Sequence, residues 1–253
     1  MIISHSKKFI FIHLEKCGGT SIEAALAPTL GKQDLLIGGE NVGESIQSRM
    51  FEQYGTQYTK NNLVWKHSTA KQAFRYIGRK NWAEYKKFTV VREPVSLAKS
   101  LFAFSQTSVA YHLPRYDHER WPQMVKDRNF PDQWPYHDEY IRAYIYSHVT
   151  RTKFDGFINY LIRYDADCFS SYYDRIRPNY FDNDMGMIVD LSQLNDRWGE
   201  ICDYISVPAT KLQQLNTSGS KDLVIKGYTE QKIRDHFALD YQRMPMYTGV
   251  TWQ

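Results

Sequence analysis

The segment at residues 9–26 reads FIFIHLEKCGGTSIEAAL and gives the strongest indication of the fold. Residues 9–14 are apolar, with β-branched and aromatic members, which predicts a short buried strand. The pair Gly18–Gly19 follows, and residues 20–26 have a helical composition that Pro28 limits. A strand, a glycine-containing loop and a helix in this order open a parallel α/β fold.

The loop between that strand and that helix has the chemistry of an anion site. Backbone N–H groups at a helix amino terminus attract anions, and glycine lets an anion approach the backbone closely. Lys16 adds a positive charge, and the hydroxyls of Thr20 and Ser21 can donate hydrogen bonds to phosphate oxygens. The lysine precedes the glycines, which differs from the GxxxxGK(S/T) order of nucleotide triphosphatases and argues against an ordinary ATPase. Taken alone, the loop is equally compatible with a simple strand-to-helix turn.

The rest of the chain continues the alternation of strands and helices. Short strands are expected at 63–67, 87–92 and 187–190. Helices are expected from Ser68 to about Ile77 with Gly78 at the end, from Pro94 onward, and at 138–149, 154–163, 191–205 and 229–241. Residues 31–62 indicate a loop with a short helix, and 109–137 an aromatic-rich insertion or substrate loop. We therefore predict one domain over residues 1–253, with an α/β, P-loop-containing three-layer fold whose central, mainly parallel sheet is flanked by helices.

Arg92 is a second candidate for binding an anion. It lies at the carboxyl end of a predicted strand, where open parallel α/β sheets bind their ligands. A guanidinium can fork onto a phosphate, and Ser100, about two helical turns further on, could reach the same group. The alternatives are a surface ion pair for Arg92 and a solvated or core-facing position for Ser100.

Composition narrows the class of ligand and the compartment. The formal net charge of +4 suits an anionic ligand, but no dense Lys/Arg run indicates nucleic acid. The three cysteines, Cys17, Cys168 and Cys202, are far apart and suggest neither a zinc site nor a disulfide framework. No apolar signal segment precedes the first strand, and no run approaches the ~18 apolar residues of a membrane span. We expect a cytoplasmic protein without a metal, a membrane span or a nucleic-acid partner.

Three segments share the sequence pattern of one family. HLEKCGGTS at 13–21 is close to HxPKTGGTS, the family's 5′-phosphosulfate loop. VVREP at 90–94, with Ser100, is close to VRNPxxRxxS, its 3′-phosphate motif, and KHSTA at 66–70 is close to a segment that carries a histidine proposed as the base. The chain thus resembles carbohydrate sulfotransferases of the heparan sulfate 2-O-sulfotransferase type, as a bacterial or viral member. The resemblance runs from about residue 8 to 240 and is specific at the two phosphate motifs.

The resemblance implies a donor and the residues that bind it. The donor would be 3′-phosphoadenosine 5′-phosphosulfate (PAPS), with adenosine 3′,5′-bisphosphate (PAP) as product and no metal. Its 5′-phosphosulfate would be held by Lys16, Cys17, Gly18, Gly19, Thr20 and Ser21. Arg92 and Ser100 would hold the 3′-phosphate, and a loop at 216–221 would close over the adenine or that phosphate through Ser218 and Lys221.

The resemblance also implies a mechanism of in-line sulfuryl transfer. Lys16 would stabilise the negative charge that develops on the bridging oxygen. His67 would take the proton of the acceptor hydroxyl, since an imidazole titrates near neutral pH. His13, inside an apolar strand, is expected to be a core residue. Two positions depart from the family pattern, because Glu15 replaces the usual proline beside the anion site and Leu97 replaces a frequent arginine. Glu15 would weaken donor binding unless it points away or pairs with a base.

The acceptor is expected to bear a hydroxyl and to be a saccharide or a glycolipid. The aromatic residues of segment 109–137 suit such a ligand and equally suit a packed cap on the core: Tyr111, Tyr116, Trp121, Trp134 and Tyr136. Two other classes of protein stay open at this point. One is a P-loop nucleotide-binding kinase or NTPase, which would need a carboxylate for Mg²⁺ after a strand, and the other is a non-catalytic member of the sulfotransferase fold.

Overall fold

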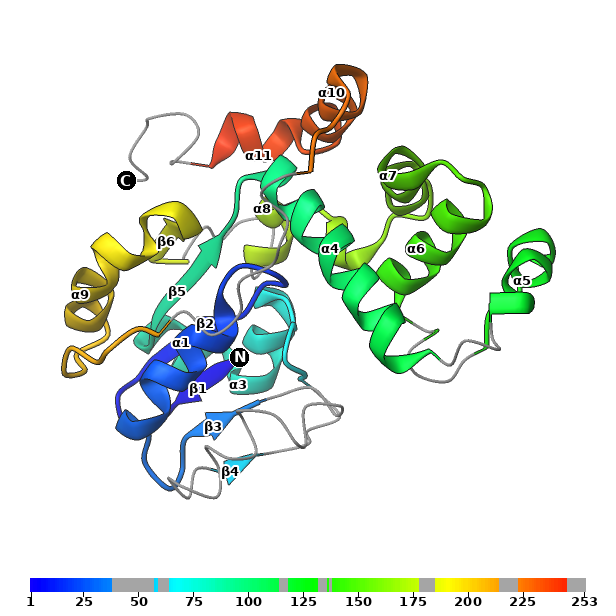
Figure 1. Cartoon of the computed structure of the whole chain (residues 1–253). Coiled ribbons are helices and arrows are strands. Elements are labelled where there is room, and N and C mark those ends of the chain that lie inside the picture. The colour runs from blue at the N-terminus through cyan, green and yellow to red at the C-terminus, as the bar shows by residue number, and fades with distance from the viewer. Residues whose placement is uncertain are drawn as a thin grey trace. The chain divides into compact units, whose positions relative to one another are not determined.

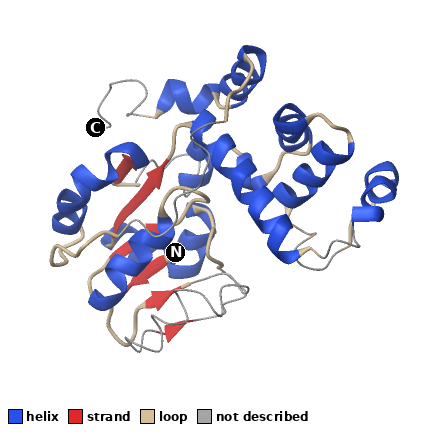
Figure 2. Ribbon diagram, viewed as in Figure 1, coloured by secondary structure: helices blue, strands red, loops and turns tan. Residues whose placement is uncertain are grey.

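The computed structural model describes residues 1–37, 57–58, 64–113, 118–131, 136, 138–177, 185–213 and 223–244. The chain divides into two compact units, Met1–Glu93 with Tyr172–Thr217 and Pro94–Ser171 with Ser218–Gln253. The strands of the described residues all belong to the first unit, and the second is helical (Figures 1 and 2). The expectation of one domain over the whole chain stays a prediction.

The described part of the first unit is built on a six-stranded sheet in the order β4-β3-β1-β2-β5-β6. Its strands are β1 (Ile2–Ser4), β2 (Phe9–Ile12), β3 (Leu35–Leu36), β4 (Gln57–Tyr58), β5 (Lys86–Val91) and β6 (Met187–Asp190). The pairs β2–β5, β5–β6 and β3–β4 are parallel, whereas β1 is antiparallel to both of its neighbours. The predicted α/β fold with a mainly parallel sheet is confirmed.

Helices flank this sheet, and the aromatic residues of its central strands form the core. The helices of the first unit are α1 (Gly19–Leu26), the 3-10 helix η1 (Ala27–Thr29), α3 (Ala70–Glu84), α8 (Tyr172–Ile176), the 3-10 helix η5 (Leu191–Gln193) and α9 (Leu194–Tyr204). Phe11 on β2 stacks on Phe88 on β5, with ring centroids 4.9 Å apart, and both side chains are buried. This packing fixes the carboxyl ends of β2 and β5, from which the glycine loop and Arg92 follow.

The antiparallel strand β1 was not expected from the sequence, because its three residues are too few to show a period. A buried carboxylate holds it in place. Asp34 accepts hydrogen bonds from the Ser4 hydroxyl at 2.9 Å, from the Ser6 amide and hydroxyl at 2.8 and 2.5 Å, and from the Gly31 amide at 2.8 Å. The contacts tie the β1–β2 hairpin to the start of β3, which lies about 30 residues away in sequence.

The strand expected at 63–67 is wrong. Val64 forms an isolated bridge, and Trp65–Ser68 is a turn instead. The Ser68 amide donates to the Trp65 carbonyl at 3.1 Å, and the Ser68 hydroxyl accepts from the Trp65 amide at 2.8 Å. Because this side chain satisfies the backbone locally, the segment does not need a ladder partner. His67 therefore lies in a turn and not at the end of a strand.

The helix that follows this turn is longer than expected. Thr69, rather than Ser68, is its N-cap, and it forms a capping box with Gln72. Gly78 leaves helical geometry with φ 78° and ψ 160°, as a helix end would, but the helix resumes and α3 reaches Glu84. The position of the break was therefore predicted correctly, whereas the end of the helix was not.

The second unit is a set of packed helices. They are α4 (Pro94–His112), α5 (Trp121–Asp127), α6 (Glu139–Val149), α7 (Lys153–Arg163), the 3-10 helix η4 (Asp167–Phe169), α10 (Gly227–His236) and α11 (Ala238–Arg243). The helices expected at 138–149 and 154–163 are confirmed, and the final helix expected at 229–241 is broken at Phe237.

The segment expected to be a loop at 109–137 is partly helical. Residues 109–112 continue α4, and α5 lies inside the segment. Trp121 and Tyr136 belong to a hydrophobic cluster with Val109, Ile141 and Ile145, and they are only 1% and 3% exposed. These two rings therefore cap the core and are not available to an acceptor. Tyr116 and Trp134 lie outside the described residues.

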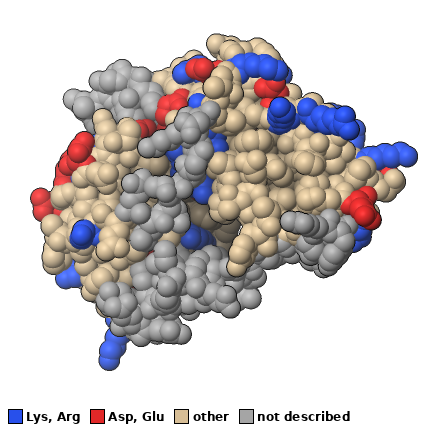
Figure 3. Space-filling view, in the orientation of Figure 1, with Lys and Arg blue, Asp and Glu red and all other residues tan. Residues whose placement is uncertain are grey.

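The surface carries charges of both signs. On the face shown in Figure 3, basic and acidic side chains are interspersed over the described residues and do not form one broad stripe of a single sign. Within the described residues, none of the helices combines the length and apolarity that crossing a membrane requires.

Candidate active site

The loop after β2 turns at two residues with left-handed backbone. Lys16 has φ 58° and Gly18 has φ 79°. Gly18 is the N-cap of α1, and as a glycine it has no side chain of its own that could cap the helix. Its carbonyl accepts from the amides of Ser21 at 3.0 Å and Ile22 at 3.3 Å, so the helix starts directly. A helix start with glycine at the N-cap lets an anion approach the first backbone amides, as in anion sites of other proteins.

Gly19 is needed for packing as well as for the approach of an anion. A Cβ at this position would lie 2.1 Å from two atoms of the His13 imidazole. Any other residue would therefore displace the ring from its place under the loop. The sequence assigned Gly19 to donor binding alone, and the structure adds this second reason for a glycine.

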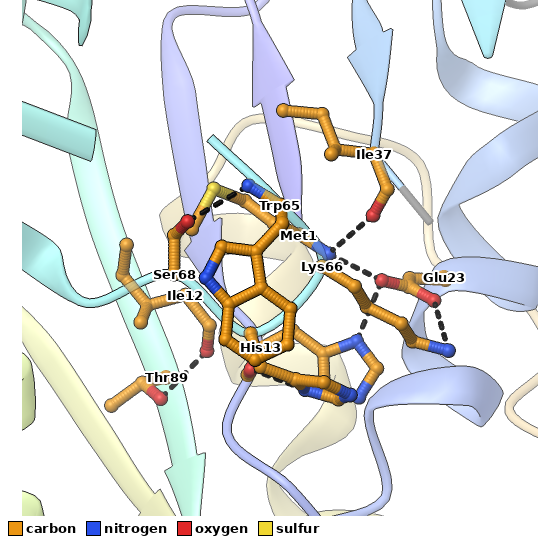
Figure 4. Close-up of polar contacts among 10 residues, drawn as sticks. Met1, Ile12, His13, Glu23, Ile37, Trp65, Lys66, Ser68 and Thr89 are labelled. Atoms are coloured by element: carbon orange, nitrogen blue, oxygen red, sulfur yellow. Dashed lines mark hydrogen bonds and ion pairs between the residues drawn. The ribbon is translucent and has the colours of Figure 1, made fainter. Parts of the chain in front are cut away.

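His13 belongs to a buried charged cluster around Glu23 (Figure 4). The Glu23 side chain accepts from His13 Nδ1 at 2.7 Å and from the Met1 amine at 2.5 Å, and Lys66 Nζ lies 3.8 Å from its other oxygen. Although burial opposes it, the hydrogen bond from His13 and the positive charges of the Met1 amine and Lys66 hold the pKa of Glu23 well below its usual range. Burial outweighs Glu23 at His13 and lowers its pKa well below 6.5, so that this imidazole is neutral. The expectation that His13 is a satisfied core residue is confirmed.

The backbone carbonyl of His13 orients the imidazole of His67. Its Nδ1 lies 3.1 Å from the carbonyl oxygen of His13, and because a carbonyl only accepts, Nδ1 is the protonated nitrogen. The other nitrogen, Nε2, is then a proton acceptor. Burial, followed by the charge of Lys66, lowers the pKa of His67 well below 6.5, which keeps the ring neutral at pH 7. The preceding carbonyl, that of Ile12, is fixed by a 2.8 Å hydrogen bond from the Thr89 hydroxyl on β5 (Figure 4).

Arg92 holds the backbone of the glycine-containing loop from the neighbouring strand of the sheet. It follows β5 directly, and its Nη1 donates to the carbonyl of Lys16 at 3.2 Å. Burial, together with the charges of Arg92 and Lys66, lowers the pKa of Lys16 to about 8. Cations that destabilise one another in a partly buried site are stabilised when an anion binds between them.

A family model described as the Sulfotransferase family matches residues 1–238. The chain belongs to the sulfotransferase family. Comparisons with curated proteins and with solved structures gave no match. The family transfers a sulfuryl group from PAPS to a hydroxyl-bearing acceptor, so the kinase or NTPase alternative is wrong. Asp190, the carboxylate that this alternative would use, instead accepts from the amide and hydroxyl of Ser192 at 2.8 and 2.6 Å.

The residues of this sulfotransferase fit a donor rich in phosphate. Lys16, Arg92 and the glycine-capped start of α1 supply positive charge and hydrogen-bond donors at one edge of the sheet. The described residues contain no group of three His, Cys, Asp or Glu side chains that could hold a metal ion. Thr20 and Ser21 lie in the first turn of α1, the position in which their hydroxyls were expected to serve.

Glu15 is paired, which answers the question that its sequence position raised. Its Oε2 lies 2.5 Å from Nη1 of Arg175 on α8, and both side chains are largely buried, with 11% and 8% exposed. Burial opposes the charge of Arg175, but Glu15 raises the pKa of the guanidinium above its ordinary value. The sequence showed that Glu15 needed a base, but nothing in the sequence pointed to Arg175, 160 residues later.

Cys17 has a structural place in the loop of the sulfotransferase. Its thiol donates to the Glu15 carbonyl at 3.2 Å and lies 3.7 Å from the hydroxyl of Tyr172, also on α8. Burial raises the pKa of Cys17 to about 12, so the side chain is a neutral thiol. Together with Arg175, Tyr172 makes the single turn of α8 a support for the loop.

The remaining residues that were predicted to bind PAPS belong to the second unit or lie outside the described residues. Ser100 lies in α4 of the second unit, where it is buried, and its assignment to the 3′-phosphate stays a prediction. Ser218 and Lys221 lie outside the described residues. Leu97, which replaces a frequent arginine, is 1% exposed.

Proposed function

We propose that this sulfotransferase moves the sulfuryl group of PAPS to a hydroxyl of a carbohydrate, with His67 as the general base. The observation that carries the proposal is the hydrogen bond from His67 Nδ1 to the His13 carbonyl. It selects the tautomer whose Nε2 can accept a proton, and the lowered pKa of His67 keeps that nitrogen unprotonated at neutral pH.

The positive charges of the loop stabilise the leaving group of the reaction. PAPS supplies the sulfuryl group and leaves as PAP when the acceptor oxygen forms its bond to sulfur. Lys16 stabilises the negative charge that collects on the phosphate oxygen as the bond between this oxygen and sulfur breaks. His67 Nε2 takes the proton that the acceptor hydroxyl loses. Arg92 holds the Lys16 carbonyl and so fixes where the loop presents its charge.

An exposed tryptophan beside the base favours a ring-bearing acceptor. Trp65 is 48% exposed, whereas Trp82, Trp121 and Trp198 are at most 6% exposed. The rings of Trp65 and His67 meet edge to face with centroids 5.4 Å apart, in a turn that Ser68 closes. A rigid aromatic face at this position suits a sugar ring, because it offers contact area with little loss of side-chain freedom.

The acceptor class is tested by incubating the full chain with PAPS labelled in its sulfuryl group. The panel holds anionic glycans, neutral glycans, glycolipids, phenols and simple alcohols. We expect label in a glycan or glycolipid, and a Trp65→Ala variant that raises the KM for it without changing the Kd for PAP. Label in phenols or alcohols alone would overturn the carbohydrate assignment. If no acceptor is labelled although PAP binds, the chain is a non-catalytic member of its family.

A further inference from the structure

The carboxylate of Glu15 creates a problem that the fold has to solve. It directly precedes Lys16, the residue expected to face the phosphosulfate, in a position where the family pattern has proline. A negative charge this close to an anion site opposes donor binding, and the side chain is too buried for water to screen it.

Arg175 contacts two functional segments with one side chain. Its Nη1 pairs with Glu15 in the donor loop at 2.5 Å, and its Nη2 donates to the carbonyl of His67 at 3.2 Å. The first contact neutralises the charge beside Lys16. The second fixes the backbone of the residue whose imidazole is oriented from its other side by His13.

Other contacts hold α8, the helix that carries Arg175, in place. The hydroxyl of Tyr172 on α8 contacts the thiol of Cys17 in the same loop. In addition, α8 packs against α3, the helix that begins just after the turn of His67. Exposed ion pairs contribute little, but in a buried pair the loss of one partner leaves an uncompensated charge. Arginine suits the role because its planar fork can donate in two directions at once.

We propose that Arg175 is a positioning residue that neutralises Glu15 and keeps the donor loop and the His67 turn in a fixed relation. This inference rests on the proposed function of His67 and adds a partner that the sequence motifs do not contain. Arg175 touches neither reactant in the proposed mechanism and acts through the two residues that it holds.

The test is a double-mutant cycle with Glu15→Gln, Arg175→Met and both together. The Kd for PAP is measured by titration calorimetry and kcat by labelled transfer. We expect Arg175→Met to raise the Kd at least about tenfold, because it leaves the Glu15 carboxylate unpaired beside the anion. Glu15→Gln alone leaves PAP binding as tight as before or tighter. The double variant recovers PAP binding but keeps a low kcat, since the His67 carbonyl still lacks the hydrogen bond from Arg175.

The pH profile separates positioning from a purely structural role. The titratable and charged groups around His67 are Lys66 on its own turn, His13 directly after β2, Glu23 on α1, the Met1 amine directly before β1 and Arg175 on α8. Loss of the Arg175 charge removes one cation that disfavours protonated His67. The acid limb of the kcat profile should therefore move to higher pH in Arg175→Met and in the double variant, and stay in place in Glu15→Gln.

An exposed ion pair of the same unit supplies the control. Arg197→Met breaks the exposed pair with Glu200 in α9 and should change neither the Kd nor the pH profile. If Arg175→Met does not fold, Arg175→Lys, which keeps the charge but loses the fork, and the Glu15→Gln variant still decide the outcome.

Additive effects of the two substitutions on PAP binding would overturn the inference, as would tighter PAP binding in Arg175→Met. A failure of the proposed base would look different. In that case the coupling between Glu15 and Arg175 would persist in PAP binding, while the acid limb would not respond to any of these variants.

Discussion

The imidazole of His13 occupies the space in which a side chain at position 19 would begin, 2.1 Å from where the Cβ would lie. This relationship joins β2 to the first residue of α1 across the donor loop. The same histidine holds His67 through its carbonyl and Glu23 through its ring. A single residue of the core thus couples the shape of the anion site to the orientation of the base.

Gly19→Ala should therefore damage both folding and donor binding. We expect a loss of about 1–3 kcal/mol in the free energy of unfolding, because the methyl group overpacks against the ring. Urea unfolding and calorimetry with PAP measure the two effects. The double variant Gly19→Ala with His13→Ala should unfold less easily than the sum of the two single effects predicts.

Gly199→Ala in α9 is the matched control. A Cβ there meets no atom within 4 Å, so the substitution should stabilise the helix by about 0.5–1 kcal/mol. A loss of stability at Gly19 no larger than the change at Gly199 would contradict the packing role of His13.

Lys16 should take up a proton when PAP binds. Its pKa of about 8 in the free enzyme means that roughly half of the side chains are neutral at pH 8, and a bound phosphate raises that pKa. Calorimetry in buffers of different ionisation enthalpy should show uptake of about half a proton at pH 8 and almost none at pH 6. Lys16→Met should abolish the uptake and Lys86→Met should keep it. Uptake that survives in Lys16→Met would assign the proton to another group.

Asp34→Ala should destabilise the hairpin of β1 and β2. The substitution removes the acceptor of the donors on Ser4, Ser6 and Gly31, of which Ser4 is fully buried, at a cost of about 1–3 kcal/mol. These hydrogen bonds lower the pKa of Asp34 although burial opposes them. A lowered folded-state pKa contributes stability above the unfolded value of about 3.9, and that stability is lost as the pH falls through the folded-state pKa. The difference from wild type in urea unfolding should thus be full at pH 7 and shrink in acid.

The three thiols should resist alkylation in the native protein. Cys17, Cys168 and Cys202 are buried, and the pKa of Cys17 is raised to about 12. Because the thiolate is the reactive form, iodoacetamide at pH 8 should modify the cysteines far more slowly than in urea. Mass spectrometry of treated protein measures this, and fast labelling of Cys17 in the native chain would contradict its place in the loop.

The sequence best predicted those strands, loops and helices that depend on interactions between residues close together in the chain. The strand, loop and helix of residues 9–26 and the strand that ends before Arg92 are confirmed, because local hydrophobicity and glycine placement determine them. The turn at Trp65–Ser68 was missed, since a serine that bonds its own backbone looks like a helix cap in the sequence.

Contacts between distant residues could not be predicted. Arg175 meets Glu15 although the two residues are 160 positions apart, and Asp34 ties together segments that no period connects. The aromatic segment was open to two interpretations, and burial of Trp121 and Tyr136 decided for the core at these positions. Trp65, which the sequence did not single out, is the exposed ring beside the base.

Single-turnover transfer of label from bound PAPS tests whether His67 is the base. His67→Ala should slow transfer by about 10²–10⁴-fold while the Kd for PAP stays unchanged. The control is His5→Ala. It changes a histidine of the β1–β2 turn that is hydrogen-bonded to the Tyr85 hydroxyl, and it should transfer label at the wild-type rate. Transfer by His67→Ala at the wild-type rate would show that His67 is not the base.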